Sequence, residues 1–378
     1  MPKKLDRNST EAKDLFGNPV EAKPNGGRLS EKFIAPPFSV LDARQGYWID
    51  RKQEWIALGL RGEEGRQDNA LGFSEVCNAP GHYKGLGQKP GQDLMKGENG
   101  NFPKSAEEKG YKQAAKSNAG LDVKTQRALG VYSAPAGSTI GRGSGGQVGT
   151  SIFDPVLCEL AYHWFCPPRG KILDPFAGGS SRGVVAEYLG YRYTGIELRP
   201  EQIEANEKQA KAIGVKPRWI LGDSFRLEEI IGDLPYEEKF DTIFTCPPYY
   251  DLEVYSEKQA DGSAFETYEK FIIWYEAIFR QAVKQLKWNR FLAIVVGEIR
   301  DEMGWYRNFV GDTIAVMRRL GLRYYNEAIL VTSIGSLPLR IDAQFSGYRK
   351  LGKTHQNVLV FYNGSNPDQI KEKFGKTF

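Results

Sequence analysis

The strongest constraint on the fold is an alternation of short apolar runs with helical segments, which extends from about residue 151 to residue 363. The apolar runs predict strands at 171–174, 191–198, 218–222, 241–245, 290–296, 324–332 and 356–362. Helical segments between and before them are expected at 156–165, 181–189, 200–212, 268–286 and 310–320. Apolar strands separated by helices indicate a parallel sheet that is covered on both faces. We therefore expect a doubly wound α/β domain over residues 151–363.

The segment Cys246-Pro247-Pro248-Tyr249 directly follows one of these strands. Each proline fixes its φ angle and lacks an N–H, so nearby carbonyl groups can point outward as acceptors. The ring of Tyr249 offers a flat face on which a base could stack. Together these residues form a lip that suits the exocyclic amino group of a flipped nucleobase.

Other candidate ligand residues also follow predicted strands, and open α/β sheets bind ligands beyond the carboxyl ends of their strands. Asp174 begins a loop that contains Gly178 and Gly179, whose missing side chains let a ligand approach the backbone. Glu197 ends the second strand, about 19 residues beyond Gly178, close to the ~20 expected between a glycine loop and a ribose-binding acid. The alternatives are a tight turn without ligand for the glycines and a helix N-cap or solvated acid for Glu197.

The two motifs, in this order and each after a strand, resemble those of the S-adenosylmethionine-dependent amino-methyltransferases of DNA. That family has Asp, Asn or Ser before Pro-Pro-Tyr/Phe, and Asp-Pro-Phe-x-Gly-Ser-Gly upstream. This chain has Cys246 at the first position of the lip, and Gly179-Ser180-Ser181 where Ser-Gly-Thr is usual. The resemblance covers about residues 151–363. It implies a Rossmann-like, seven-stranded methyltransferase sheet with its last strand antiparallel, preceded here by an irregular N-terminal extension.

The resemblance also implies a cofactor and a set of site residues. The cofactor would be S-adenosylmethionine, with Glu197 on its ribose and Asp223 on its adenine, although Asp223 could instead cap a helix at 224–231. Catalysis would rest on Cys246, Pro247, Pro248 and Tyr249. The methionine end would be lined by Phe153, Asp174, Phe176, Gly178 and Gly179, although packing alone would also explain Phe153.

Cys246 leaves the target atom open between N4 of cytosine and N6 of adenine, with a small preference for cytosine because a thiol is closer to serine than to aspartate. A thiolate that attacks a pyrimidine covalently is the alternative. In the family that uses such a thiolate, however, the cysteine follows its proline, whereas Cys246 precedes Pro247.

The expected partner is double-stranded DNA from which the target base is flipped. A loop at 334–354 carries Arg340, Arg349, Lys350 and Lys353, which suit phosphate contacts, or simply a solvated surface. A polar segment from Tyr250 to about residue 262 is expected to be a mobile flap over the base pocket. Two rival functions remain: a nucleic-acid-binding protein with this fold and little turnover, and a methyltransferase of RNA or protein.

The remaining segments differ in composition. Residues 1–30 are expected to be a flexible tail, 76–150 a Gly-rich linker and 364–378 a C-terminal tail. Residues 31–75 form an accessory segment whose aromatic residues Phe38, Trp48 and Trp55 either contact DNA or pack onto the main domain. Residues 1–150 carry a net charge of +5 against −1 for the rest, which is compatible with polyanion contact or with ordinary surface variation.

Composition excludes several other classes of protein. No apolar run approaches the ~20 residues that a membrane span requires, so no membrane association is expected. Four cysteines without a Cys-x-x-Cys pair and only three histidines make a metal site unexpected. Free thiols and the lack of a signal-like N-terminus predict a reduced, cytoplasmic setting.

Overall fold

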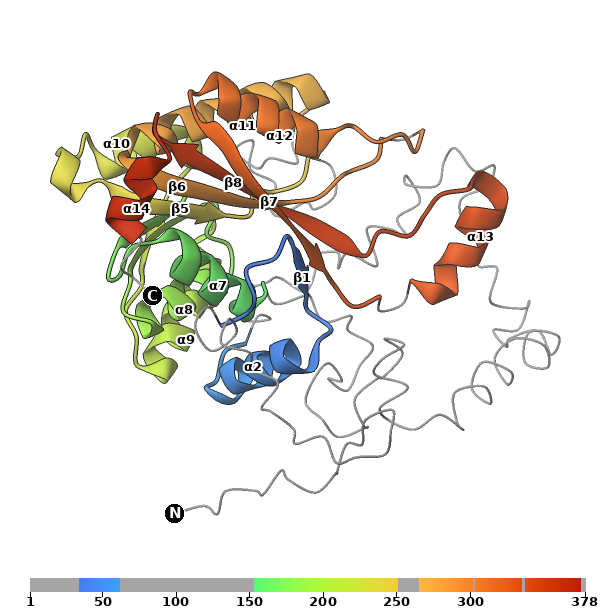
Figure 1. Ribbon diagram of the computed structural model, residues 1–378, viewed down its shortest axis with the longest axis horizontal. Helices are drawn as coiled ribbons and strands as arrows, with labels where there is room; N and C mark the ends of the chain where they lie inside the picture. Colours follow the sequence, from blue (N-terminus) through green and yellow to red (C-terminus); the bar gives the residue numbers. More distant parts are fainter. Residues whose placement is uncertain (1–33, 62–152, 251–264, 302, 335–336, 375–378) are drawn as a thin grey trace, which may run out of the picture.

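The structure is a computed structural model, and it describes residues 34–61, 153–250, 265–301, 303–334 and 337–374. Its centre is one eight-stranded sheet with the order β1-β7-β8-β6-β5-β2-β3-β4 (Figure 1). The strands are β1 (Val40–Asp42), β2 (Lys171–Asp174), β3 (Arg192–Glu197), β4 (Arg218–Leu221), β5 (Phe240–Thr245), β6 (Leu286–Val296), β7 (Arg323–Val331) and β8 (His355–Asn363).

All strands of the sheet are parallel except β8, which lies antiparallel between β6 and β7. This confirms the predicted doubly wound sheet of the Rossmann-like methyltransferase type, with its last strand antiparallel. The carboxyl ends of β2, β3, β4 and β5 therefore lie along one edge of the sheet.

Helices cover both faces of the sheet (Figure 1). One face carries α2 (Gly46–Ala57), α7 (Pro155–Phe165), α8 (Ser181–Tyr188) and α9 (Pro200–Ile213), and the other carries α10 (Leu227–Ile231), α11 (Tyr268–Lys284) and α12 (Phe309–Arg319). Each face buries its own apolar cluster against the strands. The last six residues of β6 are all buried, as expected for a central strand covered on both faces.

Three parts of the chain differ from the sequence-based prediction. The sheet has an eighth strand, because residues 40–42 pair in parallel with β7. The predicted loop at 334–354 contains α13 (Pro338–Tyr348), which begins with a proline in its first turn and ends where Arg349 adopts a left-handed conformation. The predicted tail after residue 363 contains α14 (Asp368–Phe374), whose Phe374 is buried and contacts the ring of Phe291.

The accessory segment is packed onto the main domain through α2, as one of the two interpretations predicts. Trp48 and Trp55 are 0% and 4% exposed, whereas Phe38 is 63% exposed and does not share this role. The indole N–H of Trp48 donates to Asp154 at 3.1 Å, and that of Trp55 donates to the buried Glu159 at 3.3 Å.

The two basic residues of α2 take part in the same docking. Lys52 pairs with Asp154 at 3.1 Å, and Arg51 Nε donates to Glu159 at 2.8 Å. Both bases therefore already have carboxylate partners on the main domain. In this structure they stabilise the docking of α2 rather than present unpaired charge to a polyanion.

The predicted tail at 1–30, the linker at 76–150 and the flap beyond Tyr250 lie outside the described residues. Within the described ranges, none of the helices combines the length and apolar character that a membrane-spanning helix needs.

Candidate functional site

Asp174 organises the loop that follows β2. Its side chain is fully buried, and both of its oxygens are occupied. Oδ2 accepts from Arg182 Nε at 2.6 Å and from the Tyr193 hydroxyl at 2.8 Å. Oδ1 accepts from Thr245 Oγ1 at 2.7 Å and from the backbone N–H of Phe176 at 3.1 Å. A carboxylate has about four acceptor sites, so Asp174 holds the site together and offers no further acceptor to a ligand.

Arg182 fixes the backbone of the same loop from the first turn of α8. Its Nη2 donates to the carbonyl oxygens of Phe176 at 2.5 Å and Ala177 at 2.9 Å. Its guanidinium also lies over the ring of Phe153, 4.5 Å from the centroid. Burial disfavours the cation, but Asp174 raises the pKa of Arg182 above its ordinary value, so the buried ion pair stays charged.

Gly178 and Glu197 bring the ends of β2 and β3 together. Gly178 has a φ of +51°, which disfavours other residues, and its carbonyl accepts from Asn206 Nδ2 at 2.8 Å. Its backbone N–H donates to the Glu197 carboxylate, which also accepts from the backbone N–H of Arg199 at 3.0 Å. Burial raises the pKa of Glu197, while these donors and the charge of Arg199 oppose the shift. A Cβ added at Gly179 would meet no atom within 4 Å, so this part of the loop borders open space.

Asp223 follows β4 and caps the short helical turn Ser224–Arg226, where it accepts from the backbone N–H of Phe225 at 2.9 Å. The predicted capping role is therefore present. One carboxylate oxygen makes this bond, and the side chain is only partly buried. An adenine contact through the other oxygen remains a prediction.

The lip Cys246–Tyr249 begins directly where β5 ends. Because Thr245 donates to Asp174, the first residue of the lip is tied to the end of β2 and to the glycine loop. Cys246 is partly buried, and it lies near Arg182. Cys158 and Cys166, by contrast, are buried, and burial raises the pKa of Cys166 to about 12. Cys246 is the only one of the three described cysteines that is not fully buried.

Tyr249 is held from two sides. Its ring packs in a T-shaped arrangement with that of Phe309, with the ring centroids 5.9 Å apart, and its hydroxyl accepts from Gln356 Nε2 at 3.3 Å. Gly297, just beyond β6, lies against both this hydroxyl and Lys353, because an added Cβ there would be 3.5 Å from Tyr249 Oη and 2.6 Å from Lys353 Nζ. The side chain of Lys353 is thus beside the lip.

Lys353 is one of the basic residues predicted to contact DNA, and its side chain is partly buried. Its ammonium donates to the carbonyl of Glu298 at 3.3 Å. Burial lowers the pKa of Lys353 to about 8; the charge of Arg300 adds to this shift, and Glu298 opposes it.

The other predicted basic residues belong to α13 or follow it. Arg349 is exposed, and its guanidinium lies 5.4 Å from the ring of Phe345. Lys350 is partly buried and lies 5.4 Å from the ring of Tyr348. The backbone of Arg340 belongs to α13, but its side chain lies outside the described part of the chain. In Figure 1, α13 extends beyond the carboxyl ends of the parallel strands.

The sequence did not identify several residues that shape the site. Arg182, Tyr193 and Asn206 hold Asp174 and Gly178 in place. Arg182 carries one usable signal, since it is a charged residue inside the otherwise small and apolar stretch Ser-Arg-Gly-Val-Val-Ala. Glu298 was also missed, and it caps α12 through the backbone N–H groups of Phe309 and Val310 at 3.1 and 3.2 Å.

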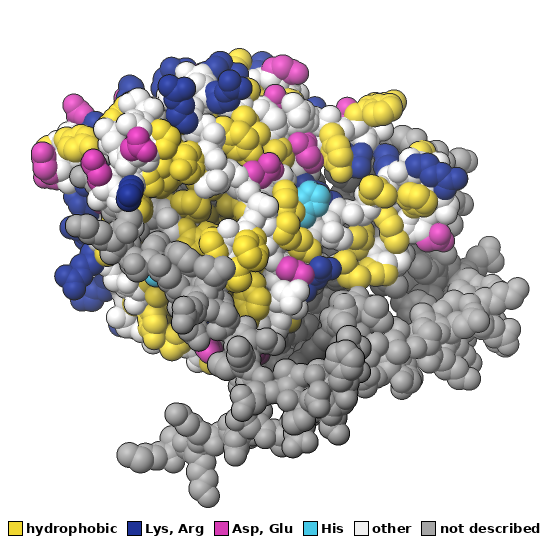
Figure 2. All heavy atoms as spheres, viewed as in Figure 1, with side chains coloured by type: hydrophobic (Ala, Val, Ile, Leu, Met, Phe, Trp, Pro, Cys, Tyr) yellow, Lys and Arg dark blue, Asp and Glu magenta, His cyan; other side chains and the backbone are white. Residues whose placement is uncertain are grey.

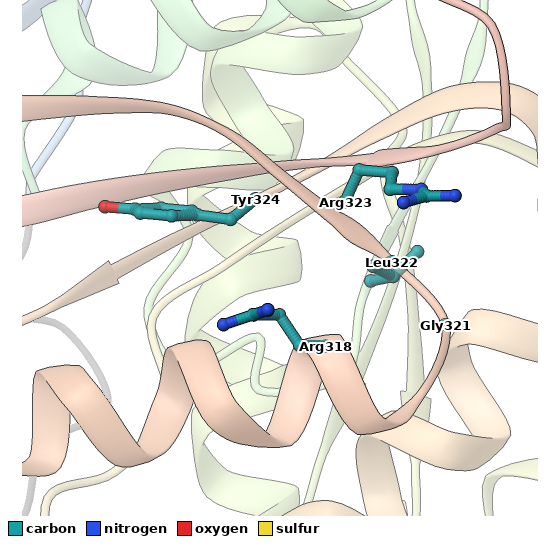
Figure 3. Close-up of a pocket in the computed structure, with 5 residues that line it drawn as sticks. All are labelled: Arg318, Gly321, Leu322, Arg323 and Tyr324. Atoms are coloured by element: carbon teal, nitrogen blue, oxygen red, sulfur yellow. The ribbon is translucent and has the colours of Figure 1, made fainter.

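A hollow of about 550 Å³ lies at the end of the sheet opposite to the candidate site (Figure 3). It is lined by Arg318, Gly321, Leu322, Arg323 and Tyr324, where α12 ends and β7 begins. Figure 3 shows Arg318 and Tyr324 on the same side, with Arg323 pointing away from both. None of the motif residues lies there, so the hollow is separate from the candidate site. Within the described residues, no cluster of acidic, histidine and cysteine side chains could hold a metal ion.

No protein-family model and no curated protein sequence matches this chain. Solved structures resemble it in fold, with low identity. A TehB-like SAM-dependent methyltransferase from Corynebacterium glutamicum is 18% identical, with 57% of this chain and 90% of that one covered and a TM-score of 0.32. An rRNA methylase from Streptococcus thermophilus is 9% identical, with coverages of 57% and 100% and a TM-score of 0.35. A methyltransferase from Pyrococcus furiosus is 15% identical, with coverages of 57% and 85% and a TM-score of 0.36.

Proposed function

We propose that this protein transfers a methyl group from S-adenosylmethionine to the exocyclic amine of a cytosine (N4) or an adenine (N6) that is flipped out of duplex DNA. The observation that carries the proposal is the junction of the two motifs. The hydrogen bond from Thr245 to Asp174 places the start of the Cys246–Tyr249 lip at the end of the strand that leads into the glycine loop. A methyl acceptor at the lip would then lie beside a donor at the loop.

The residues around the loop fit this cofactor. Glu197 supplies a carboxylate at the end of β3 beside the backbone of Gly178, which suits ribose hydroxyl groups. The open space beside Gly179 leaves room for a ligand against the loop. When bound, the cofactor supplies an electrophilic methyl group on a sulfonium.

The lip would activate and orient the amine. The amine nitrogen would take up the methyl group that the bound cofactor supplies, the electron pair of the broken bond would stay on sulfur, and the amine would lose one proton to solvent. The carbonyl of Pro247 and the side chain of Cys246 would accept hydrogen bonds from the amine hydrogens. These acceptors stabilise the positive charge that develops on nitrogen. Tyr249, fixed by Phe309 and Gln356, would support the base by stacking.

The direct test identifies the methylated product. The protein is incubated with cofactor labelled in its methyl group and with duplex DNA, RNA or unrelated proteins in separate reactions, followed by digestion and mass spectrometry. We expect label in N4-methylcytosine or N6-methyladenine from DNA. Label in 5-methylcytosine, in RNA or in protein would overturn the proposal. Cofactor binding without any transfer would also overturn it, in favour of a binding protein.

Substitutions in the lip test the role of Cys246. We expect Cys246→Ser to retain substantial methylation, because a hydroxyl accepts a hydrogen bond at least as well as a thiol. Tyr249→Ala should lower the single-turnover rate much more, since base stacking contributes about 1–3 kcal/mol. A dead serine variant together with a covalent adduct of the wild type on 5-fluorocytosine DNA would instead show a cysteine nucleophile.

A further inference from the structure

A tight hairpin follows β6 and was not recognised in the sequence. We call residues 300–306 the aromatic hairpin, of which residue 302 is not described. Arg300 and Tyr306 form an antiparallel bridge, and the guanidinium lies 3.9 Å from the centroid of the Tyr306 ring. Asp301 closes the turn, because its carboxylate accepts from the backbone N–H of Trp305 at 2.8 Å. Gly304 has a φ of +86°, and its carbonyl accepts from Arg300 Nη1 at 2.8 Å. The hairpin therefore has a defined shape.

This well-bonded turn presents large apolar side chains to solvent. Met303 is 75% exposed, Trp305 is 72% exposed and Tyr306 is 50% exposed. Single exposed apolar residues are common on protein surfaces, but several on one turn indicate a binding surface. On the neighbouring α13 segment, Tyr348 and Leu351 are exposed as well.

The hairpin borders the base-binding lip and the basic segment after α13. Lys350 lies against its tip, since a Cβ added at Gly304 would be 1.9 Å from Lys350 Nζ. Lys353 follows three residues later and lies beside Gly297 and the hydroxyl of Tyr249. Figure 2 shows hydrophobic and basic side chains together at this end of the molecule, and Figure 1 shows the hairpin between β6 and α12.

The charges of this surface favour an anionic partner. Its cations are Arg300, Arg349, Lys350 and Lys353. The described acids nearby are Asp301, which accepts from the Trp305 backbone, Glu298, which caps the start of α12, and Asp342, which accepts from Ser346 at 3.2 Å. Each keeps its negative charge, so four cations against three acids leave a net charge of +1 among these described residues.

We infer that the aromatic hairpin is a DNA-contacting element, in which Trp305 stacks on a base next to the one extruded toward Tyr249 while Lys350 contacts a backbone phosphate. Exposed aromatic rings beside cations match the way proteins hold unstacked bases and their phosphates. The inference rests on the proposed function, because it takes the Cys246–Tyr249 lip to be the base pocket. It adds an element outside both regions that the sequence offered for DNA contact.

The chain supplies a matched control for Trp305. Trp288 is 49% exposed, but it lies near the start of β6, whereas the aromatic hairpin follows the end of that strand. Binding of fluorescent mixed-sequence DNA duplexes is measured by anisotropy in the presence of S-adenosylhomocysteine. We expect Trp305→Ala to weaken binding roughly 5- to 150-fold, the loss typical of one stacking aromatic, and Trp288→Ala to leave it unchanged. Lys350→Gln should reduce the slope of log affinity against log salt by about one phosphate contact.

Two further readouts separate the inference from the proposed function. Calorimetric titration with S-adenosylhomocysteine should give the same affinity for wild type and Trp305→Ala, which shows that the variant is folded and its cofactor site intact. Equal DNA affinity of Trp305→Ala and Trp288→Ala would overturn the inference while leaving the proposed function standing. If wild type binds duplexes through Trp305 but methylates no base in them, the proposed function fails and the contact surface stands. Tighter, Trp305-dependent binding of single-stranded RNA than of duplex DNA would overturn the assignment to DNA.

Discussion

Glu197 combines two properties that a ribose-binding acid needs: a fixed position and a remaining charge. The backbone N–H groups of Gly178 and Arg199 hold its carboxylate at the end of β3, and the side chain is 8% exposed. Burial raises its pKa, but the donors and Arg199 limit the rise. A buried carboxylate stays charged only when it is paired or hydrogen-bonded, and these partners meet that requirement.

We predict that Glu197→Gln weakens the binding of S-adenosylhomocysteine by about 1.5–3 kcal/mol, because it replaces a charged acceptor by a neutral one. Calorimetric titration measures the effect, and thermal unfolding shows whether the variant is folded. The control is Glu204→Gln on the exposed side of α9, which should leave the affinity unchanged. Unchanged affinity in a folded Glu197→Gln protein would remove this residue from the cofactor site.

Lys353 gives a prediction about pH that does not depend on any ligand. Its pKa is about 8 in the folded protein, below the ordinary 10.5, and burial is the main cause. Between these two values the unfolded chain binds more protons than the folded one, so the stability contributed by this group rises with pH. Below pH 8 both states are protonated and the penalty of burying the cation is constant.

We therefore expect wild type to gain stability relative to Lys353→Met as the pH rises from about 8 to 10.5, by on the order of 1–2 kcal/mol after allowing for the partial exposure of the ammonium. Urea unfolding of both proteins across this pH range measures the difference in their free energies of unfolding. Tyrosines that titrate in both proteins contribute equally to each and cancel in this difference. A difference that stays flat, or that falls with pH, would show that the Lys353 ammonium is not disfavoured in the folded state.

At the scale of elements, the sequence predicted most of the central domain. Strand and helix bounds between Lys171 and Asn363 agree within a few residues, because buried parallel strands leave continuous apolar runs. Strand β1 and helices α13 and α14 were not predicted. β1 has only three residues, α13 has exposed and partly buried side chains without a clear apolar stripe, and α14 buries only Phe374 of its described side chains. Such short or weakly amphipathic elements exist through their tertiary contacts, which no local pattern records.

In the candidate site, too, some residues could be predicted from the sequence and others could not. Motif spacing located the residues that end strands, such as Asp174 and Glu197, because the ends of parallel strands meet at one edge. It could not show that Asp174 is saturated by Arg182, Tyr193 and Thr245, since these partners come from three different elements. The same limit applies to Lys353, which the sequence placed in a basic loop with phosphate contact or solvation as alternatives; its position beside Tyr249 follows only from the folded structure.

The docking of α2 makes a prediction about single residues of one helix. Trp48 is fully buried and donates to Asp154, whereas its neighbour Tyr47 is 46% exposed. Trp48→Ala should lower the free energy of unfolding by about 3–5 kcal/mol, because it leaves a large cavity. Tyr47→Ala should change it by no more than about 0.5 kcal/mol. Urea unfolding measures both, and equal small effects would mean that α2 is not part of the folded core.

At the scale of the whole molecule, residues 34–61 hold together two distant parts of the main domain. β1 extends the sheet beside β7, while α2 packs on α7, and Gln209 of α9 donates to the carbonyl of Arg61 at 2.6 Å. Asp154 caps the start of α7 and lies next to Phe153, whose ring lies under the guanidinium of Arg182. Contacts therefore run without a break from α2 to the glycine loop, through Asp154, Phe153 and Arg182.

This continuity predicts that the segment stabilises the domain even when it is supplied as a separate peptide. A chain that begins at residue 151 lacks β1, which pairs with β7, and α2, which packs on α7. We therefore expect it to unfold at a lower temperature than the full chain. A peptide of residues 34–61 should raise that temperature in a concentration-dependent way, because a ligand that binds only the folded state stabilises it. The same peptide with Trp48→Ala should have little effect, since it lacks the ring that fills the interface with α7. Stabilisation by both peptides alike, or by neither, would contradict a specific docking of this segment through Trp48.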